Sequence, residues 1–442
     1  MVIGGDAGGM AAASGVRRLR PEVEIIVVEK GGHTSYAMCG IPYVVGGEVD
    51  DVDLLVARTP AEFGAMDIEV RVHTEATAVD LEARTVETRD LDTGATRSLG
   101  FDQLMIGTGA RPIVPGWALA DHPQVSVVHT LPDAARLETM AAGCQGRRVV
   151  VVGGGYIGIE MAEAFLARGA HVTIVSRGSH LLTNLDPEMS DRVAEAARAE
   201  GIDLVLGQAV EGLTATTVVT GSGAELPADI VVLALGVQPN SELAAAAGLA
   251  TGIQGALVVD DHQRTSVEGV YAAGDCCESI HRVSGRPTWI ALGTVANKAS
   301  RVAGVNLGGG DATFGGVLGT AITRLVGTEI ARTGLSVAQA LEAGFDPVGT
   351  TIEASTRARY YPGAEDIAVR VVHDRGTRRL LGGQIVGGAG AGKRIDTVAT
   401  ALWGGFSVDD LVDLDLAYAP PFGPVWDPVN TAGRQASRRP AR

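Results

Sequence analysis

The chain has 442 residues, which is too long for a single hydrophobic core, so two or three domains are expected. Hydrophobic residues make up 46% of the sequence and charged residues 20%, a composition that excludes a disordered protein. The formal net charge of −16 argues against nucleic acid as the main partner, because contacts with phosphates need a basic surface.

The cysteine count and the apolar runs indicate where the protein works. Four cysteines, Cys39, Cys144, Cys276 and Cys277, are too few for a disulfide framework, which favours a reducing, cytoplasmic compartment. Glycine or charge interrupts every apolar run before about 18 residues, so no membrane span is expected. No signal peptide and no metal site are predicted either.

The first predicted dinucleotide-binding unit starts at the N-terminus. A short strand ends at Ile3, a glycine-rich turn covers residues 4–9, a helix is expected over residues 10–19, and a second strand ends at Glu29. This order is typical of a βαβ unit in which glycines let the backbone approach a pyrophosphate at the helix N-terminus. Asp6 stands where the middle glycine of the fingerprint belongs, so the match is partial. The predicted contacts in this turn are Gly4, Gly5, Gly8 and Gly9.

Two groups of side chains in or near this unit are candidate ligand-binding residues. Glu29, at the end of the second strand, can accept hydrogen bonds from both hydroxyls of an adenosine ribose. Arg17, Arg18 and Arg20 lie on or just after the helix and could bind the phosphates of a substrate. A solvated helix face is the alternative interpretation of these arginines.

Cys39 lies in residues 35–43, which include Pro42, and no second cysteine follows it four or five residues later. One thiol must therefore carry out sulfur chemistry alone, or form a mixed disulfide with a substrate. Pro42 suits the first turn of a helix, and a helix N-terminus is expected to lower the pKa of the thiol. An inert buried cysteine is the alternative.

The second predicted unit has a complete fingerprint. A valine-rich strand over residues 149–152 leads to Gly153, Gly155 and Gly158, then to a helix over residues 159–168 and a strand over residues 171–175. Two fingerprints, each within a βαβ unit, are much stronger evidence for dinucleotide binding than one.

The residue that reads the ribose in this second unit is Ser176, followed by Arg177. A carboxylate there would repel a 2′-phosphate, whereas serine and arginine would bind one, so the sequence predicts that NADPH is preferred. A solvated arginine that still allows NADH is the alternative.

Further segments fit a flavin site and the crossovers between domains. Residues 106–112 end a strand and mark a crossover, and residues 234–240 resemble them and mark the return. Residues 265–275 form a strand that runs into Gly274-Asp275. Asp275 could hold a ribityl hydroxyl or a phosphate-bridging water, and a plain helix N-cap is the alternative.

These strings together resemble the single-cysteine branch of the pyridine nucleotide–disulfide oxidoreductases over essentially the whole chain. The most specific are residues 36–43 and residues 417–429. Within the branch they are most similar to coenzyme A disulfide reductases, with NADH oxidases and persulfide reductases as near kin. The resemblance implies FAD contacts at Lys30, Thr108, Gly109, Ala296 and Asn297, and NAD(P)H contacts at Tyr156, Ile157, Glu160 and Gly236.

The fold implied is α/β, with two Rossmann-like dinucleotide-binding domains arranged as in glutathione reductase and an α+β C-terminal dimerisation domain. The expected FAD domain is discontinuous, over residues 1–112 and 241–312, and the NAD(P)H domain covers residues 113–240. The dimerisation domain would cover residues 313–430, followed by a disordered tail over residues 431–442.

The resemblance also implies the reaction. A homodimer would use NADPH, or NADH, and FAD to reduce a low-molecular-weight disulfide at Cys39, with coenzyme A disulfide as the expected substrate. Two tyrosines of the partner subunit would approach that thiol. No histidine follows His373, so Tyr418 and either Tyr360 or Tyr361 are the remaining proton donors, with Tyr360 preferred.

Other functions remain open at this point. Coenzyme A persulfide reductases and NAD(P)H oxidases belong to the same family, although Ala7 stands where the oxidases place a histidine. Residues 61–67 lack the basic residue that holds coenzyme A in the family. From another class, a redox sensor would bind FAD and NADPH without turnover. An electron-transfer reductase would not need Cys39.

Overall fold

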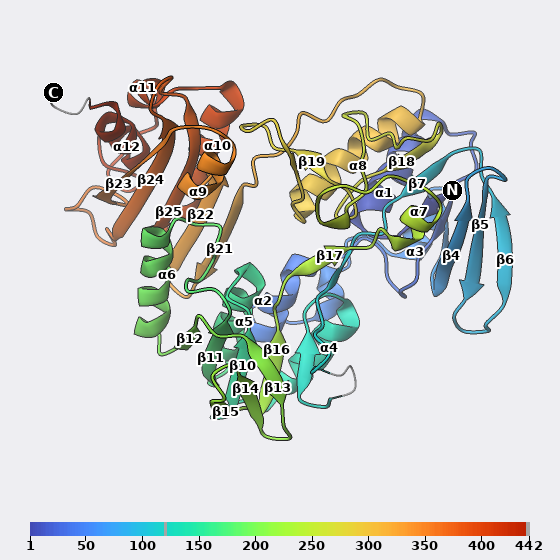
Figure 1. The fold of residues 1–442 in the computed structure, drawn as a ribbon, viewed down its shortest axis with the longest axis horizontal. Helices are drawn as coiled ribbons and strands as arrows, with labels where there is room; N and C mark the ends of the chain where they lie inside the picture. The colour runs from blue at the N-terminus through green and yellow to red at the C-terminus, as the bar shows by residue number, and fades with distance from the viewer. Residues whose placement is uncertain (119–121, 439–442) are drawn as a thin grey trace.

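The computed structural model of this protein describes residues 1–118 and 122–438. Figure 1 shows three parts, with the N-terminal part on the right, the middle of the chain below and the C-terminal part on the left. Each part has a sheet of its own with helices packed on it. None of the helices in the described ranges combines the length and the apolar character needed to cross a lipid bilayer.

The N-terminal part is built on a parallel sheet in the strand order β18-β7-β1-β2-β3. Strand β1 (Val2–Ile3) is central, because β2 (Ile26–Val28) and β7 (Leu104–Ile106) pair with its two sides. The edges are β3 (Glu69–Arg71) and β18 (Val270–Ala272). Strand β18 therefore brings the chain back to this sheet after the middle part has been completed.

Helices α1 (Ala7–Leu19) and α8 (Gly293–Leu307) pack together unusually closely. A Cβ atom added to Gly304 would lie 2.7 Å from the carbonyl oxygen of Ala12, which no side chain permits. Helix α1 begins at Ala7, three residues before the predicted start at residue 10. The same shift occurs in α5 (Tyr156–Ala167), which was expected from residue 159, because the last residues of each glycine turn already adopt helical geometry.

Smaller elements complete the N-terminal part. They are the 3-10 helices η1 (Met38–Gly40), η2 (Val52–Leu55) and η3 (Ile253–Gly255), the helices α2 (Ile41–Gly46), α3 (Pro60–Gly64) and α7 (Glu242–Ala246), the hairpin β19 (Ser279–Ile280) and β20 (Pro287–Thr288), and the antiparallel sheet of β4 (Thr74–Asp80), β5 (Thr85–Asp90) and β6 (Thr96–Gly100).

The middle part repeats the parallel architecture, with the strand order β12-β11-β10-β16-β9. Its near-continuous valine and isoleucine runs are buried, as expected where helices cover both faces of a sheet. The strands are β9 (Val125–Val127), β10 (Arg148–Val152), β11 (His171–Ser176), β12 (Asp203–Leu206) and β16 (Ile230–Leu233), accompanied by α4 (Leu131–Ala142), α5 and α6 (Pro187–Ala199) and by the antiparallel β13 (Val210–Leu213), β14 (Thr217–Thr220) and β15 (Glu225–Pro227). The two connections to the first part, β8 (Ala110–Pro112) and β17 (Val237–Pro239), pair with each other.

The C-terminal part is an antiparallel sheet in the order β21-β22-β25-β24-β23, packed against helices. Its strands are β21 (Ala321–Leu325), β22 (Thr328–Gly334), β23 (Pro347–Ser355), β24 (Asp366–Asp374) and β25 (Leu380–Gly387), and its helices are α9 (Val337–Glu342), η4 (Gly392–Arg394), α10 (Ile395–Gly404), α11 (Val408–Val412) and α12 (Pro428–Ser437).

The prediction of a disordered tail from residue 431 is wrong for residues 431–437. Helix α12 continues to Ser437, and its residues Ala432 and Ala436 are buried against the C-terminal core. Arg378 also donates a hydrogen bond to the carbonyl oxygen of Ser437, at 3.2 Å. The polar, arginine-rich sequence does not predict this helix, because its buried face within residues 431–437 consists only of small residues. The rest of the predicted tail, residues 439–442, lies outside the described residues.

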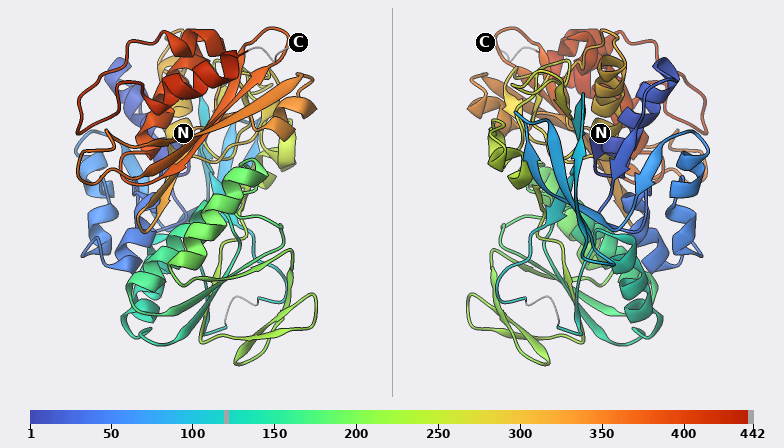
Figure 2. Two further views of the ribbon diagram at one scale, coloured as in Figure 1. Left: turned by 90° about the vertical axis from the view of Figure 1, so that its left-hand side faces the viewer. Right: turned by 90° about the vertical axis from the view of Figure 1, so that its right-hand side faces the viewer.

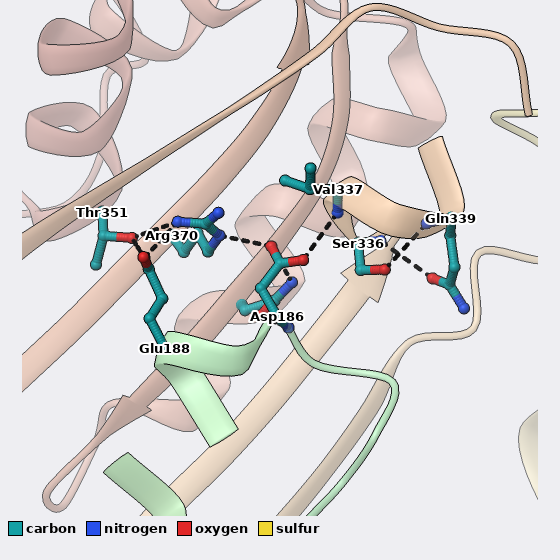
Figure 3. Close-up of polar contacts among 8 residues, drawn as sticks. Asp186, Glu188, Ser336, Val337, Gln339, Thr351 and Arg370 are labelled. Carbon is teal, nitrogen blue, oxygen red and sulfur yellow. Dashed lines mark hydrogen bonds and ion pairs between the residues drawn. The ribbon is translucent and has the colours of Figure 1, made fainter. Parts of the chain in front are cut away.

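A buried polar network joins the middle part to the C-terminal part. Helix α6 crosses beneath the C-terminal sheet (Figure 2) and begins at its N-cap Asp186, whose side chain is 4% exposed. Arg370 on β24 approaches that carboxylate at 2.5 Å, and Gln384 on β25 donates to it at 3.0 Å. The backbone N–H of Val337 donates to the other oxygen at 2.9 Å (Figure 3). Two parts of the chain are thereby fixed to each other through one carboxylate.

Candidate active site

Cys39 lies in the 3-10 turn η1, immediately before helix α2, and it is a free, exposed cysteine. The turn is held at its base, because the N–H of Ala37 donates to the carbonyl oxygen of Leu55 at 2.8 Å. The other three cysteines are buried. Cys276 and Cys277 have sulfur atoms 3.7 Å apart, too far for a disulfide bond.

The electrostatic environment of Cys39 differs from the expectation. Partial burial of its sulfur raises the pKa of the thiol, and the carboxylates of Glu160, Asp275 and Asp6 raise it further. The predicted lowering of the thiol pKa by a helix N-terminus is therefore wrong. Helix α2 has only six residues, so its dipole is small compared with three carboxylates that converge from other elements.

Among the described residues of this region, Asp275 has a buried carboxylate oxygen that lacks a hydrogen-bond donor. Its Oδ1 atom is buried and accepts no hydrogen bond from any described residue, and burial raises the pKa of the carboxyl to about 6. No helix begins at Asp275, so the N-cap alternative does not apply. A buried acceptor of this kind requires a donor, and a ribityl hydroxyl of a flavin fits that requirement.

The first glycine turn has the backbone shape that a dinucleotide requires. Gly4 has a φ of +104°, and a Cβ there would lie 2.2 Å from the carbonyl oxygen of Gly107. Glu29 is fixed at the edge of the turn, since its two carboxylate oxygens accept hydrogen bonds from the N–H groups of Gly5 and Gly31, each at 2.6 Å. The neighbouring Lys30 forms an ion pair with Glu75 at 2.8 Å.

The other residues predicted to contact FAD lie on two segments. Thr108 donates its hydroxyl to the carbonyl oxygen of Asn240 at 2.6 Å, and Gly109 follows with a φ of +66°. Ala296 is buried in helix α8, and the amide of Asn297 donates to the carbonyl oxygen of Gly293 at 2.9 Å. A Cβ on Gly274 would meet Gly8 and Ala296, and a Cβ on Gly8 would meet Gly107, the residue before Thr108, so these segments lie around one region.

The second glycine turn repeats this geometry. Gly153 has a φ of +125°, and a Cβ on Gly158 would lie 2.0 Å from the carbonyl oxygen of Gly153. Nothing lies within 4 Å of a Cβ added to Gly155, so this side of the turn is open to a ligand. Tyr156 and Ile157 form the first turn of α5. Gly236, with a φ of +92°, lies at the return crossover.

The two residues predicted to read the ribose differ in their surroundings. Ser176 is buried at the end of β11, and a Cβ on Gly154 would lie 3.2 Å from its Oγ. Arg177 is exposed and forms no hydrogen bond or ion pair with the residues that the structure describes. Its charge is therefore available to a ligand.

The three arginines predicted to hold the substrate are mostly engaged elsewhere. Arg17 donates to the carbonyl oxygens of Pro21 and Asp67, at 2.6 Å and 2.5 Å, and Arg20 forms an ion pair with Glu22. Arg18 is exposed. Arg58, which directly precedes Thr59, was not predicted as a site residue from the sequence.

Arg58 lines a cavity of about 230 Å³ next to helix α1. Polar groups of the lining come from Ser14, Ser35 and Asn297. Ser35 lies four residues before Cys39, so the cavity adjoins the segment that carries the thiol. The guanidinium of Arg58 lies 5.3 Å from the ring centroid of Phe63, which keeps it at this wall.

The candidate proton donors form a separate aromatic surface on the C-terminal part. Tyr360 is 77% exposed and Tyr418 is 48% exposed. Partial desolvation and the neighbouring Tyr418 raise the pKa of Tyr360, so these two hydroxyls are close together. The loops are joined by a hydrogen bond from the N–H of Ala358 to the carbonyl oxygen of Pro420, at 3.2 Å. No described contact within one chain connects either tyrosine to Cys39.

The comparisons with known proteins cover the whole chain. A family model described as pyridine nucleotide-disulphide oxidoreductase matches residues 1–298, and a model of the dimerisation domain of the same family matches residues 320–428. The chain is 40% identical over 438 residues to the NAD(P)H coenzyme A polysulfide/persulfide reductase of Pyrococcus horikoshii, covering 98% of this chain and 97% of that one. It is 29% identical to the coenzyme A disulfide reductase of Staphylococcus aureus, covering 99% of each chain.

Solved structures show the same similarity. The reduced CoADR-RHD of Bacillus anthracis superposes with a TM-score of 0.95 and is 33% identical, covering 99% of this chain and 79% of that one. The NAD-dependent persulfide reductase of A. fulgidus superposes with a TM-score of 0.94 and is 38% identical, covering 98% and 82%.

Proposed function

Because the chain belongs to the pyridine nucleotide-disulphide oxidoreductase family, whose members depend on FAD and NAD(P)H, we propose that it is an NADPH-dependent reductase of coenzyme A disulfide with Cys39 as its redox cysteine. The observation that carries the proposal is the position of Cys39. Its charged neighbours are Asp275, on the predicted flavin side, and Glu160, on the predicted nicotinamide side.

The residues of the chain have defined tasks in this reaction. Bound FAD would supply two-electron transfer between the nicotinamide and the sulfur. Asp275 and Glu29 would hold its hydroxyl groups, and the glycine turns would accommodate the pyrophosphates. The Cys39 thiolate would attack one sulfur of coenzyme A disulfide, forming a mixed disulfide and releasing the other coenzyme A as a thiolate, which takes up a proton.

A second candidate substrate is a coenzyme A persulfide. The relative from Pyrococcus horikoshii, whose name includes this activity, shares more identity with the chain than the relative named a disulfide reductase. Cys39 would attack the persulfide by the same chemistry. An assay of the purified holoenzyme with NADPH separates the candidates. Coenzyme A disulfide and coenzyme A persulfide are each offered under anaerobic conditions, and oxygen is offered alone in a separate reaction. Oxidation of NADPH with oxygen alone would contradict both.

The substrate is proposed to lie against Arg58 and the adjoining cavity. A guanidinium can bind the phosphates of coenzyme A, and Ser14 and Ser35 supply further donors in the same cavity. Arg58, just before the N-cap of α3, would take the place of the basic residue that residues 61–67 lack.

The nicotinamide preference gives one prediction. Arg177→Ala is expected to lower kcat/KM for NADPH about tenfold, through the loss of a charge-assisted contact to the 2′-phosphate, while kcat/KM for NADH stays within about twofold. Steady-state rates with each coenzyme at one substrate concentration provide the measurement. An unchanged ratio of the two values would contradict NADPH as the preferred donor.

A second copy of the chain is proposed to bring Tyr418 and Tyr360 to Cys39, which explains why neither reaches it within one chain. Tyr418→Phe and Tyr360→Phe are expected to lower kcat at least about tenfold, since each removes a positioned proton donor. Tyr361→Phe is the matched control and should keep kcat, because Tyr361 is not the residue beside Tyr418. If Tyr361→Phe has the largest effect, the assignment of the pair is reversed.

A further inference from the structure

Strand β21 of the C-terminal part reaches the helix of the second glycine turn. The hydroxyl of Thr323 donates a hydrogen bond to Oε1 of Glu160, on α5, at 2.9 Å. The next residue, Arg324, forms an ion pair with Glu163, one turn further along α5, at 3.1 Å. Arg324 also pairs with Glu48, which follows α2, so this strand end contacts all three parts of the protein.

Glu160 lies among groups that respond to its charge. Burial raises the pKa of Glu160, the hydrogen bond from Thr323 opposes that change, and Glu163 on the same helix adds to it. Arg324 pairs with Glu163 and opposes its negative charge. From the neighbouring elements, Cys39 on η1 and Tyr43 on α2 face Glu160, and its carboxylate raises the pKa of both. Tyr156, on the same helix, is affected in the same direction.

We propose that Thr323 is a positioning residue of the active site, whose hydroxyl fixes the carboxylate of Glu160 near Cys39 and stabilises its charged form. A buried carboxylate keeps its charge only where donors replace the lost water, and Thr323 is the one side-chain donor to Glu160 among the described residues. Through Glu160, the dimerisation domain thereby contributes to the electrostatic environment in which Cys39 becomes a nucleophile. The inference rests on the proposed role of Cys39 and not on the identity of the substrate.

The test detects the charge of Glu160 through its effect on the reactivity of Cys39. In the reduced holoenzyme, the rate at which iodoacetamide alkylates Cys39 is followed by mass spectrometry as a function of pH. Thr323→Val removes the donor at almost constant volume, so the pKa of Glu160 rises and the carboxylate is neutral over a wider range. The thiolate then meets less repulsion, and alkylation at the acidic end of the profile should be about threefold to tenfold faster.

Matched variants separate this role from a merely structural one. Thr323→Ser keeps the hydroxyl and should restore the profile of the natural protein. Thr333→Val removes another buried threonine hydroxyl, which is paired with Thr320 at 2.7 Å, and should leave the profile unchanged. Glu160→Gln should itself speed alkylation, and Thr323→Val should add nothing in that background, because the two changes act through one charge.

Two results would overturn the inference: a Thr323→Val profile that superposes on that of the natural protein, or the same acceleration in the Glu160→Gln background. Alkylation needs no turnover, so a protein that fails to reduce coenzyme A disulfide would contradict the proposed function and still give a result for Thr323.

Discussion

Replacing Cys39 by serine is expected to abolish the reduction of coenzyme A disulfide and persulfide by NADPH, with kcat falling at least about a thousandfold. Serine is nearly isosteric with cysteine, but its hydroxyl cannot form a mixed disulfide and cannot exchange electrons as a thiol does. NADPH-dependent reduction of an artificial acceptor such as ferricyanide should persist, because that path does not pass through the sulfur. Steady-state assays with both acceptors on the same preparation provide the comparison.

The control for this variant is Cys144→Ala, which removes a buried thiol of the middle part whose sulfur lies 3.8 Å from the carbonyl oxygen of Arg168. It should lower stability slightly and leave kcat unchanged. If Cys39→Ser retains turnover with coenzyme A disulfide, the single-cysteine mechanism is incorrect. If Cys39→Ser also loses ferricyanide reduction, the cysteine has a role in binding FAD or NADPH that the mechanism above does not contain.

The largest expected effect on stability comes from Asp186. Asp186→Ala leaves the guanidinium of Arg370, which is 12% exposed, beside Glu188 alone, and it leaves the N–H of Val337 and the amide of Gln384 without their acceptor. Removing one partner of a buried ion pair costs about 3–5 kcal/mol of unfolding free energy. Thermal unfolding of the holoenzyme should show a fall in Tm of roughly 6–20 °C, using about 2–4 °C per kcal/mol for a domain of this size.

Two further variants show how much the charge of Asp186 and its hydrogen bonds each contribute to the free energy of unfolding. Asp186→Asn keeps an acceptor for Val337 and should cost less than alanine. Asp346→Ala removes an exposed partner of Arg375, at 3.0 Å, and should cost less than about 1 kcal/mol, because exposed ion pairs contribute little. Equal losses from Asp186→Ala and Asp346→Ala would show that the network between α6 and the C-terminal sheet does not hold these parts together.

The sequence is most informative where function depends on the local backbone. Gly4 and Gly153 adopt positive φ angles and admit no Cβ, so the residue type itself reveals the turn. The order of strand, turn and helix then predicts the parallel sheets, and the two crossover segments predict the paired strands β8 and β17. The family, the fold class and the enzyme class follow from these strings, and the comparisons confirm them.

The sequence is less informative about side chains that act together but lie on elements far apart in the chain. Arg58 was missed because only the folded loop brings it to the cavity beside Ser14. Helix α12 was missed because its packing depends on Ala432 and Ala436 meeting a core built from other strands.

Local sequence alone therefore determined that this chain has two glycine turns, each followed by a helix, and a single cysteine in the segment before α2, since glycine geometry and residue identity are properties of short segments. The tertiary structure alone decided the direction in which the pKa of Cys39 moves, because partial burial raises it and Glu160, Asp275 and Asp6 approach from three separate segments and raise it further. Coulomb interactions and burial act through space, and a rule based on the neighbouring helix α2 cannot include them.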